Sequence, residues 1–286
     1  MLTSALPGLT DWTAQLADTA LPVLRRTWRR IDVLTQAAEE TSARDLATTI
    51  ASDPLATLRL FAFMASHRQA RQLTEITSVE GCVVMAGVPP LLDDFGAAPQ
   101  IEDYLHGRPE ALRGLLRVVR RSHHAARLAW LFGAWRNDHD PGALATAALL
   151  HDFVETLLWA VAPDLALQMD RRLREDSTLR SRVAQRAVLN VEVNELQVAL
   201  ASIWQLPELY REMMDDSSAR HPRALLVVHT VALARHAALG WDNAALPDDY
   251  RALGGLLNTS PERVRAMAEP QQEGLRADVA DEDSPH

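Results

Sequence analysis

Residues 142–162 read GALATAALLHDFVETLLWAVA, and this stretch decides the fold. Its apolar residues are dense enough for a helix in a protein core, and Pro141 stands where proline favours a helix start. The pair His151-Asp152 interrupts the apolar run. Polar and charged side chains in such surroundings are costly unless they are paired or bind a metal. The stretch therefore predicts a buried helix whose His-Asp pair has specific partners.

The rest of the chain predicts more helices and no strands. Ala, Leu and Arg dominate the 286 residues, while Phe, Trp and Tyr together reach only 5%. That composition favours helices over strands. Ser42, Asp53, Ser78 and Ser260 each precede a helical pattern and carry a side chain suited to capping it. We expect an all-α, two-lobed helical bundle.

The boundary between the lobes is predicted in the stretch 87–110, which holds four prolines and three glycines. An N-terminal helical lobe then covers residues 1–110, and a second helical lobe covers 111–269. Residues 270–286 hold five acidic residues and one arginine. This tail has almost no apolar content and is predicted to be disordered.

Composition excludes several classes of protein. A single cysteine forms neither an internal disulfide nor a cysteine-based zinc module. The net charge of -9 argues against a general nucleic-acid binder. No run of 18 uninterrupted apolar residues is present, so no membrane span is expected, and the N-terminus lacks the pattern of a signal peptide. We therefore expect a cytoplasmic protein that binds neither nucleic acid nor membranes.

Two interpretations of the His-Asp pair stay open. In the first, the pair is hydrogen-bonded and ties helices together. In the second, it belongs to a hydrolytic site for Fe, Mn or Zn, which would need ligands from other helices and an open position for water. The candidate metal ligands are His123, His124, His151, Asp152 and His229.

Arginines form two groups at helical spacing. Arg117, Arg121 and His124 make a stripe beside the His-Asp stretch and are a candidate pocket for a small anionic ligand. Arg25, Arg26, Arg29 and Arg30 are interpreted as a solvated helix face rather than an anion site. Four tryptophans are interpreted as core anchors of the second lobe: Trp130, Trp135, Trp159 and Trp204.

Five motifs in a fixed order resemble the HDOD domain, the HD-related output domain of bacterial signalling proteins. The resemblance covers roughly residues 15 to 240. The His-Asp signature corresponds to ALLHDFVETLLW at 148–159. The other four are the Leu-Pro helix ALPVLRRTWRRI at 20–31, the Ser-Asp-Pro segment at 42–66, ITSVEGCVVMAGV at 76–88 and IWQLPELYREMM at 203–214.

Departures from the metal-binding HD pattern accompany these matches. The resemblance places Arg121 at the position of an upstream His ligand, although a shift of two residues would place His123 there. It places Val193 at a further His position, Asp215-Asp216 near a His-His pair, and Arg235 at the position of the closing Asp. A cation at a metal-ligand position repels the metal. The resemblance thus implies a degenerate HD-type helical core.

HDOD proteins are regarded as non-catalytic relatives of the HD phosphohydrolases. The resemblance therefore implies a regulatory module in signal transduction that binds signalling proteins or a small anionic ligand and carries no cofactor. The competing hypothesis is a metal-dependent phosphohydrolase that acts on a nucleotide or a cyclic dinucleotide. It would use the five candidate metal ligands named above.

Overall fold

The computed structural model describes residues 1–67, 76–176, 178–214 and 220–269, and within these ranges it is helical with no β-strand. The all-α prediction is thereby confirmed. In chain order the helices are α1 (Leu9–Ala17), α2 (Arg25–Gln36), α3 (Ala43–Ala51), α4 (Pro54–Ser66), α5 (Val79–Ala86), α6 (Val88–Gly96), α7 (Ile101–Tyr104), α8 (Pro109–Trp135), α9 (Pro141–Leu150), α10 (Phe153–Val161), α11 (Pro163–Glu175), α12 (Ser181–Leu189), α13 (Val193–Ile203), α14 (Glu208–Met214), α15 (Pro222–Ala237), α16 (Leu246–Leu257) and α17 (Pro261–Ala268).

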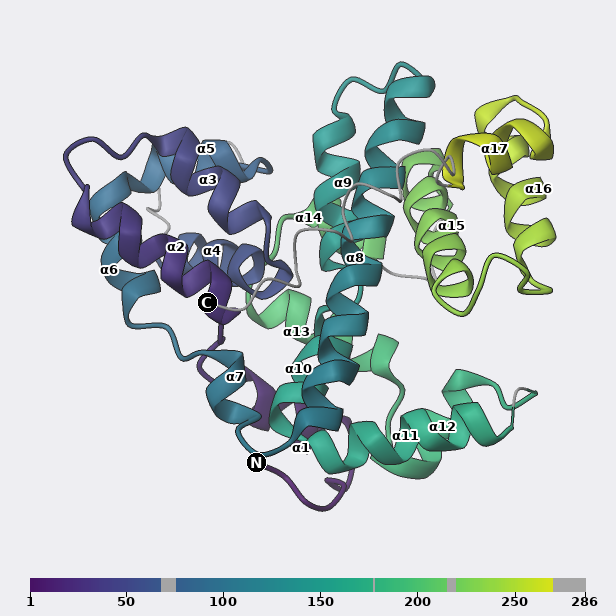
Figure 1. Cartoon of the computed structure of the whole chain (residues 1–286), viewed down its shortest axis with the longest axis horizontal. Helices are drawn as coiled ribbons and strands as arrows, with labels where there is room; N and C mark the ends of the chain where they lie inside the picture. The colour runs from purple at the N-terminus through teal and green to yellow at the C-terminus, as the bar shows by residue number, and fades with distance from the viewer. Residues whose placement is uncertain (68–75, 177, 215–219, 270–286) are drawn as a thin grey trace, which may run out of the picture.

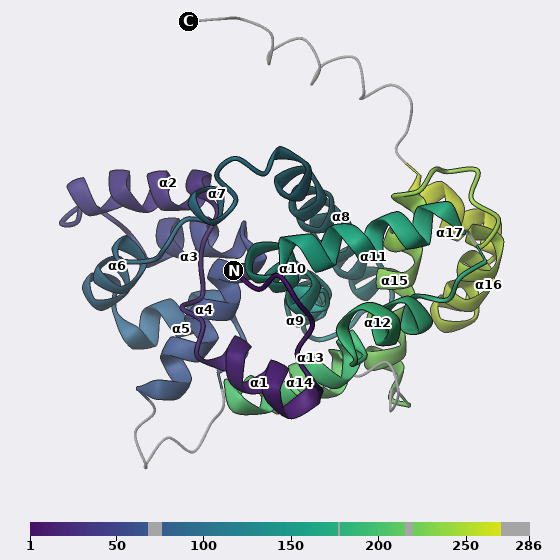
Figure 2. The same cartoon turned by 90° about the horizontal axis from the view of Figure 1, so that it is seen from below.

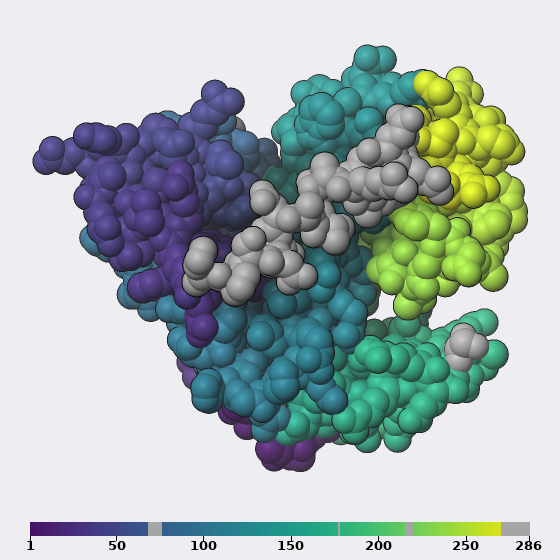
Figure 3. All heavy atoms as spheres, viewed as in Figure 1, coloured from purple at the N-terminus to yellow at the C-terminus, as the bar shows by residue number. Residues whose placement is uncertain are grey.

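The helices form two groups that meet along a seam. Helices α2 to α6 make a smaller group, and the long helix α8 runs through a larger group that extends to α17 (Figure 1, Figure 2). The two groups separate toward the top of the space-filling view (Figure 3). Helix α4 packs against α9 and α10 across the seam. There the Phe61 ring meets Tyr210 edge-on at 5.3 Å, and the Tyr210 hydroxyl donates to the Thr77 carbonyl.

The first helix departs from this division, because α1 packs against α13 of the larger group. Trp12 is fully buried and donates its indole N–H to the Leu189 carbonyl at 2.7 Å. The Leu2 N–H reaches the Val161 carbonyl at 2.8 Å, and the Asn190 side chain donates to the Leu6 carbonyl. Residues before the first predicted motif are thus part of the core. The predicted boundary near residue 110 stays a prediction.

The stretch 87–110 is more ordered than its prolines suggested. Helix α6 begins directly after Gly87, and α7 follows within the same stretch. Val23 pairs with this region, since its N–H donates to the Pro99 carbonyl and its carbonyl accepts from the Ile101 N–H. This pairing keeps Val23 extended, so α2 begins at Arg25, inside the Leu-Pro motif at 20–31. The predicted acidic tail, residues 270–286, lies outside the described residues.

The predicted helix caps at Ser42, Asp53, Ser78 and Ser260 all accept a backbone N–H of the first turn. Asp53 does more than cap α4. It is fully buried and also accepts the Leu24 N–H at 2.7 Å, so it joins α4 to the chain just before α2. Burial raises the pKa of Asp53, because an ionised carboxylate loses its water there. Three backbone N–H groups compensate for part of that loss.

We expect Asp53→Ala to lower the free energy of unfolding by about 2 kcal/mol, because it removes a helix cap and leaves the buried Leu24 N–H without its acceptor. Ser260→Ala is the matched control, since Ser260 caps α17 at an exposed position and its loss should cost about 1 kcal/mol or less. Urea denaturation of both variants measures the difference. Equal losses would show that Asp53 acts as a cap alone.

By length and composition the stretch Pro141–Val161 could cross a membrane. In the fold, however, 83% of this apolar window is buried inside the protein. The stretch is therefore part of the buried core, as the sequence predicted.

Candidate functional site

The His-Asp pair lies at a break between two helices. Helix α9 ends at Leu150 and α10 begins at Phe153, so His151 and Asp152 form the turn between them. The expected continuous helix over 142–162 is therefore interrupted. Both side chains remain inside the protein, at 2% and 4% exposure. The break turns both side chains toward α8 and α15, which pack on α9.

Two arginines hold the carboxylate of Asp152. Arg121 of α8 donates to Oδ2 through Nε at 2.8 Å and through Nη2 at 2.5 Å. Arg235 of α15 donates to the other oxygen, Oδ1, at 2.5 Å. Each carboxylate oxygen thus has a guanidinium at short hydrogen-bond distance, and three helical segments are joined at one buried charge.

Glu155 and His151 complete this charged cluster. Glu155, in the first turn of α10, accepts from Arg121 at 2.7 Å. The His151 Nδ1 lies 3.4 Å from Oδ1 of Asp152 and 3.5 Å from Nη2 of Arg235. The two arginines are therefore balanced by two carboxylates. Sequence reasoning missed the role of Glu155. Its spacing of three residues from Asp152, on the same helix side, is the signal that could have found it.

The charges of this cluster determine how Asp152 titrates. Burial raises the pKa of Asp152, but Arg121 and Arg235 outweigh that effect and hold the pKa well below its usual range. In turn, burial lowers the pKa of Arg121, while Asp152 and Glu155 outweigh that and raise it. Asp152 is therefore an ionised carboxylate whose charge is fully engaged by cations.

The five candidate metal ligands are not brought together. His123 donates to the Ser52 carbonyl at the seam, at 2.9 Å. His124 meets the Trp241 ring edge-on, and burial lowers its pKa to about 4. His229 lies half-buried on α15. Only His151 and Asp152 are neighbours, and nowhere in the described part of the chain do three His, Cys, Asp or Glu side chains form a group suited to a metal.

The residues around Asp152 do not fit a metal ion. A divalent metal needs several neutral or anionic donors with free lone pairs. Here both oxygens of Asp152 already accept from guanidinium groups, and two positive charges occupy the space where further ligands would have to lie. The structure places Arg121, and not His123, against Asp152. This agrees with the family resemblance, which placed Arg121 and Arg235 at metal-ligand positions.

The candidate anion pocket of Arg117, Arg121 and His124 is not assembled as predicted. Arg117 binds Asp170 of α11 at 2.9 Å, and Arg121 is engaged by Asp152 and Glu155. His124 has its pKa lowered by burial and carries no positive charge at neutral pH. These three side chains therefore do not form a cationic pocket for an anionic ligand.

Two of the four tryptophans predicted as core anchors lie at the surface. Trp159 and Trp204 are buried, as expected. Trp130 and Trp135 are 53% and 43% exposed, because they lie on the outer face of the C-terminal end of α8. An arginine of α17, Arg263, lies over the Trp135 ring at 5.6 Å. The apolar pattern alone does not distinguish a helix face that other helices cover from one that they leave open.

Comparisons with known proteins agree with this architecture. A family model described as the HDOD domain matches residues 21–219. No curated protein matches the chain significantly. The fold is similar to that of the MmoQ response regulator of Methylococcus capsulatus, with 19% identity and a TM-score of 0.64 over 89% of this chain and 100% of that one. It is also similar to a virulence factor of Campylobacter jejuni, with 17% identity and a TM-score of 0.63 over 92% and 96%. At these identities the likeness shows a shared fold.

Proposed function

This chain belongs to the HDOD domain family, and from that premise we propose that it is a non-catalytic regulatory module that acts by binding a signalling protein or a small ligand. The observation that carries the proposal is Asp152, whose two oxygens bind Arg121 and Arg235. In this interpretation the HD-type core has become a structural element that joins α8, α10 and α15. The protein acts in the cytoplasm, and its charge of -9 disfavours nucleic acid as the partner.

The charged cluster supports the proposal through electrostatics. Hydrolysis by an HD-type site would require a metal to activate water and to offset the charge that develops on a phosphate. The two arginines supply positive charge, but Asp152 and Glu155 neutralise it. Because the arginines occupy both oxygens of Asp152, this carboxylate is not available to a metal ion. The cluster is suited to holding helices in one arrangement.

An activity assay tests the proposal. Purified protein is supplied in turn with Fe, Mn and Zn and then with nucleotides and cyclic dinucleotides. We expect no hydrolysis above the rate of a buffer control, and the same result for the isosteric variant Asp152→Asn. Hydrolysis by the wild-type protein that Asp152→Asn abolishes would overturn the proposal and favour a metal-dependent phosphohydrolase.

A further inference from the structure

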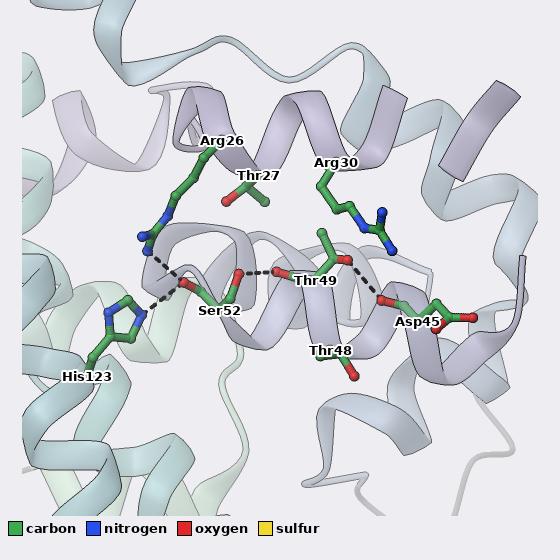
Figure 4. A pocket seen from close by; sticks show the side chains of 8 residues that line it. All are labelled: Arg26, Thr27, Arg30, Asp45, Thr48, Thr49, Ser52 and His123. Atoms are coloured by element: carbon green, nitrogen blue, oxygen red, sulfur yellow. Dashed lines mark hydrogen bonds between the residues drawn. The ribbon is translucent and has the colours of Figure 1, made fainter. Parts of the chain in front are cut away.

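A pocket of about 590 Å³ lies between α2 and α3, with one end at the seam between the two groups of helices (Figure 4). Asp152 is not among the residues that line it. The volume of the pocket is within the range of about 300–1,000 Å³ that is typical of small-molecule sites. Helices α2 and α3 form its walls, and α8 closes one end with His123. The residues that line it are all of polar or charged types, with two arginines, three threonines, one serine, one histidine and one aspartate.

The two arginines of the pocket are Arg26 and Arg30, one turn apart on α2. Several arginines nearby are held by carboxylates, including Arg25 by Asp103 and Arg59 by Asp94. Arg26 instead donates to the Ser52 carbonyl at 3.2 Å, and neither pocket arginine forms an ion pair with a carboxylate of the described residues. Two cations whose charge is not offset by a direct partner thus line one concave surface.

Further polar groups lie beside them. Thr27 is 2% exposed and lines the pocket between the two arginines, as Figure 4 shows. Its hydroxyl is buried beside the Asp53 carboxyl, so Thr27 backs the pocket wall and offers no donor to a ligand. The Ser52 carbonyl would repel an anion, but Arg26 and His123 both donate to it.

One acid moderates the positive charge of the pocket. Asp45 lies at the end opposite His123, with Arg30 toward it and Arg26 toward His123 (Figure 4). The carboxylate of Asp45 accepts from the Ser42 hydroxyl at 2.5 Å. The pocket therefore has a cationic centre and an acceptor at one end. This arrangement suits an anionic group beside a part of the ligand that carries N–H or O–H donors.

We propose that this pocket binds a small molecule that carries a phosphate group, held between Arg26 and Arg30, with its polar remainder toward Asp45. Phosphate fits because guanidinium groups donate paired N–H bonds to its oxygens. A small molecule fits because the site is concave and the chain as a whole is acidic, which disfavours a long polyanion. Binding of such a ligand does not depend on the proposed regulatory function. Only the role of the ligand as a signal rests on that function.

The ligand would also contact both groups of helices. The lining includes residues of α2 and α3 on one side and His123 of α8 on the other. His123 and Arg26 meet at the same atom, the Ser52 carbonyl. If a bound phosphate draws Arg26 away from the Ser52 carbonyl, this carbonyl keeps the His123 N–H as its donor. Binding therefore changes the surroundings of the hydrogen bond between His123 and Ser52, which joins the two groups across the seam.

Isothermal titration calorimetry tests the proposal, with pyrophosphate and adenosine monophosphate as the probes. We expect saturable binding to the wild-type protein. The double variant Arg26→Gln/Arg30→Gln should weaken it by about tenfold or more, because it removes two charged hydrogen-bond donors. The matched control, Arg29→Gln/Arg113→Gln, removes the same charge from two exposed arginines outside the pocket and should bind within about twofold of the wild type.

Two outcomes would overturn the proposal. One is the absence of saturable binding by the wild-type protein to either probe. The other is an equal loss of affinity in the control variant, which would show that net charge alone attracts the anion. Circular dichroism verifies that both variants are folded. The outcome is independent of the hydrolysis assay: a protein that binds adenosine monophosphate and also hydrolyses nucleotides retains the pocket but contradicts the non-catalytic function.

Discussion

Replacing Asp152 with alanine is expected to lower the free energy of unfolding by about 3–5 kcal/mol, which is the effect of removing one partner from a buried ion pair. Arg121, whose side chain is only 16% exposed, would lose two of its hydrogen bonds, and Arg235 would lose its carboxylate. A loss of this size is comparable to the whole stability of some domains, which is about 5–15 kcal/mol. Urea denaturation followed by far-ultraviolet circular dichroism measures it.

The control for this prediction is Asp164→Ala. Asp164 also pairs with an arginine, Arg108, at 2.5 Å, but its side chain is 46% exposed. Exposed pairs contribute about 0–1 kcal/mol, so this variant should remain close to the wild type. If Asp152→Ala does not fold at all, Asp152→Asn retains the shape and one acceptor and allows the comparison. Equal stability of Asp152→Asn and the wild type would contradict a structural role for the charge.

The pH dependence of the free energy of unfolding gives a second measure of the ion pairs of Asp152. Because the pKa of Asp152 is held below its unfolded value of about 3.9, its ionisation stabilises the folded state above that pH. The contribution is lost as the pH falls through the lower, folded-state pKa. The advantage of the wild type over Asp152→Asn should therefore be full at neutral pH and shrink only below about pH 4.

Replacing Trp12 with alanine is expected to cost about 3–5 kcal/mol, as large-to-small changes at buried aromatic positions do. Trp12 is fully buried and donates to the Leu189 carbonyl, so the variant loses apolar contact and leaves an acceptor without its partner. Trp12 precedes the HDOD match at residues 21–219, so this variant tests whether α1 is integral to the fold.

Trp130→Ala is the matched control for Trp12. Trp130 is 53% exposed, so its removal should change the free energy of unfolding by less than about 0.5 kcal/mol. Both values come from the same urea series. A Trp12 variant as stable as the Trp130 variant would show that α1 is dispensable for the fold, despite its packing against α13.

Local features of the fold were predictable from the sequence because their causes are local. Asp53 and Ser78 cap helices through contacts with residues two or three positions away, and the sequence contains both partners. The HDOD resemblance was likewise predictable, since its motifs recur in order. That resemblance placed Arg121 and Arg235 at metal-ligand positions, and the structure joins both residues to Asp152.

The remaining features depend on distant contacts. The break at His151-Asp152 follows from partners 31 and 83 residues away, whereas the apolar pattern of 142–162 is continuous. Exposure of Trp130 depends on which helices happen to cover α8. The pocket beside Arg26 and Arg30 forms where α2 meets α3. The sequence predicted a solvated face for the arginines of α2, because it does not show that α3 lies opposite them.

The most direct test of the central claim is the metal content of the purified protein. Cells are supplied with Fe, Mn and Zn, and the protein is analysed after dialysis, beside Asp152→Asn. If Arg121 and Arg235 occupy both oxygens of the Asp152 carboxylate, the metal content is far below one equivalent and is the same in both proteins. One tightly held equivalent in the wild type that is lost in Asp152→Asn would contradict the account.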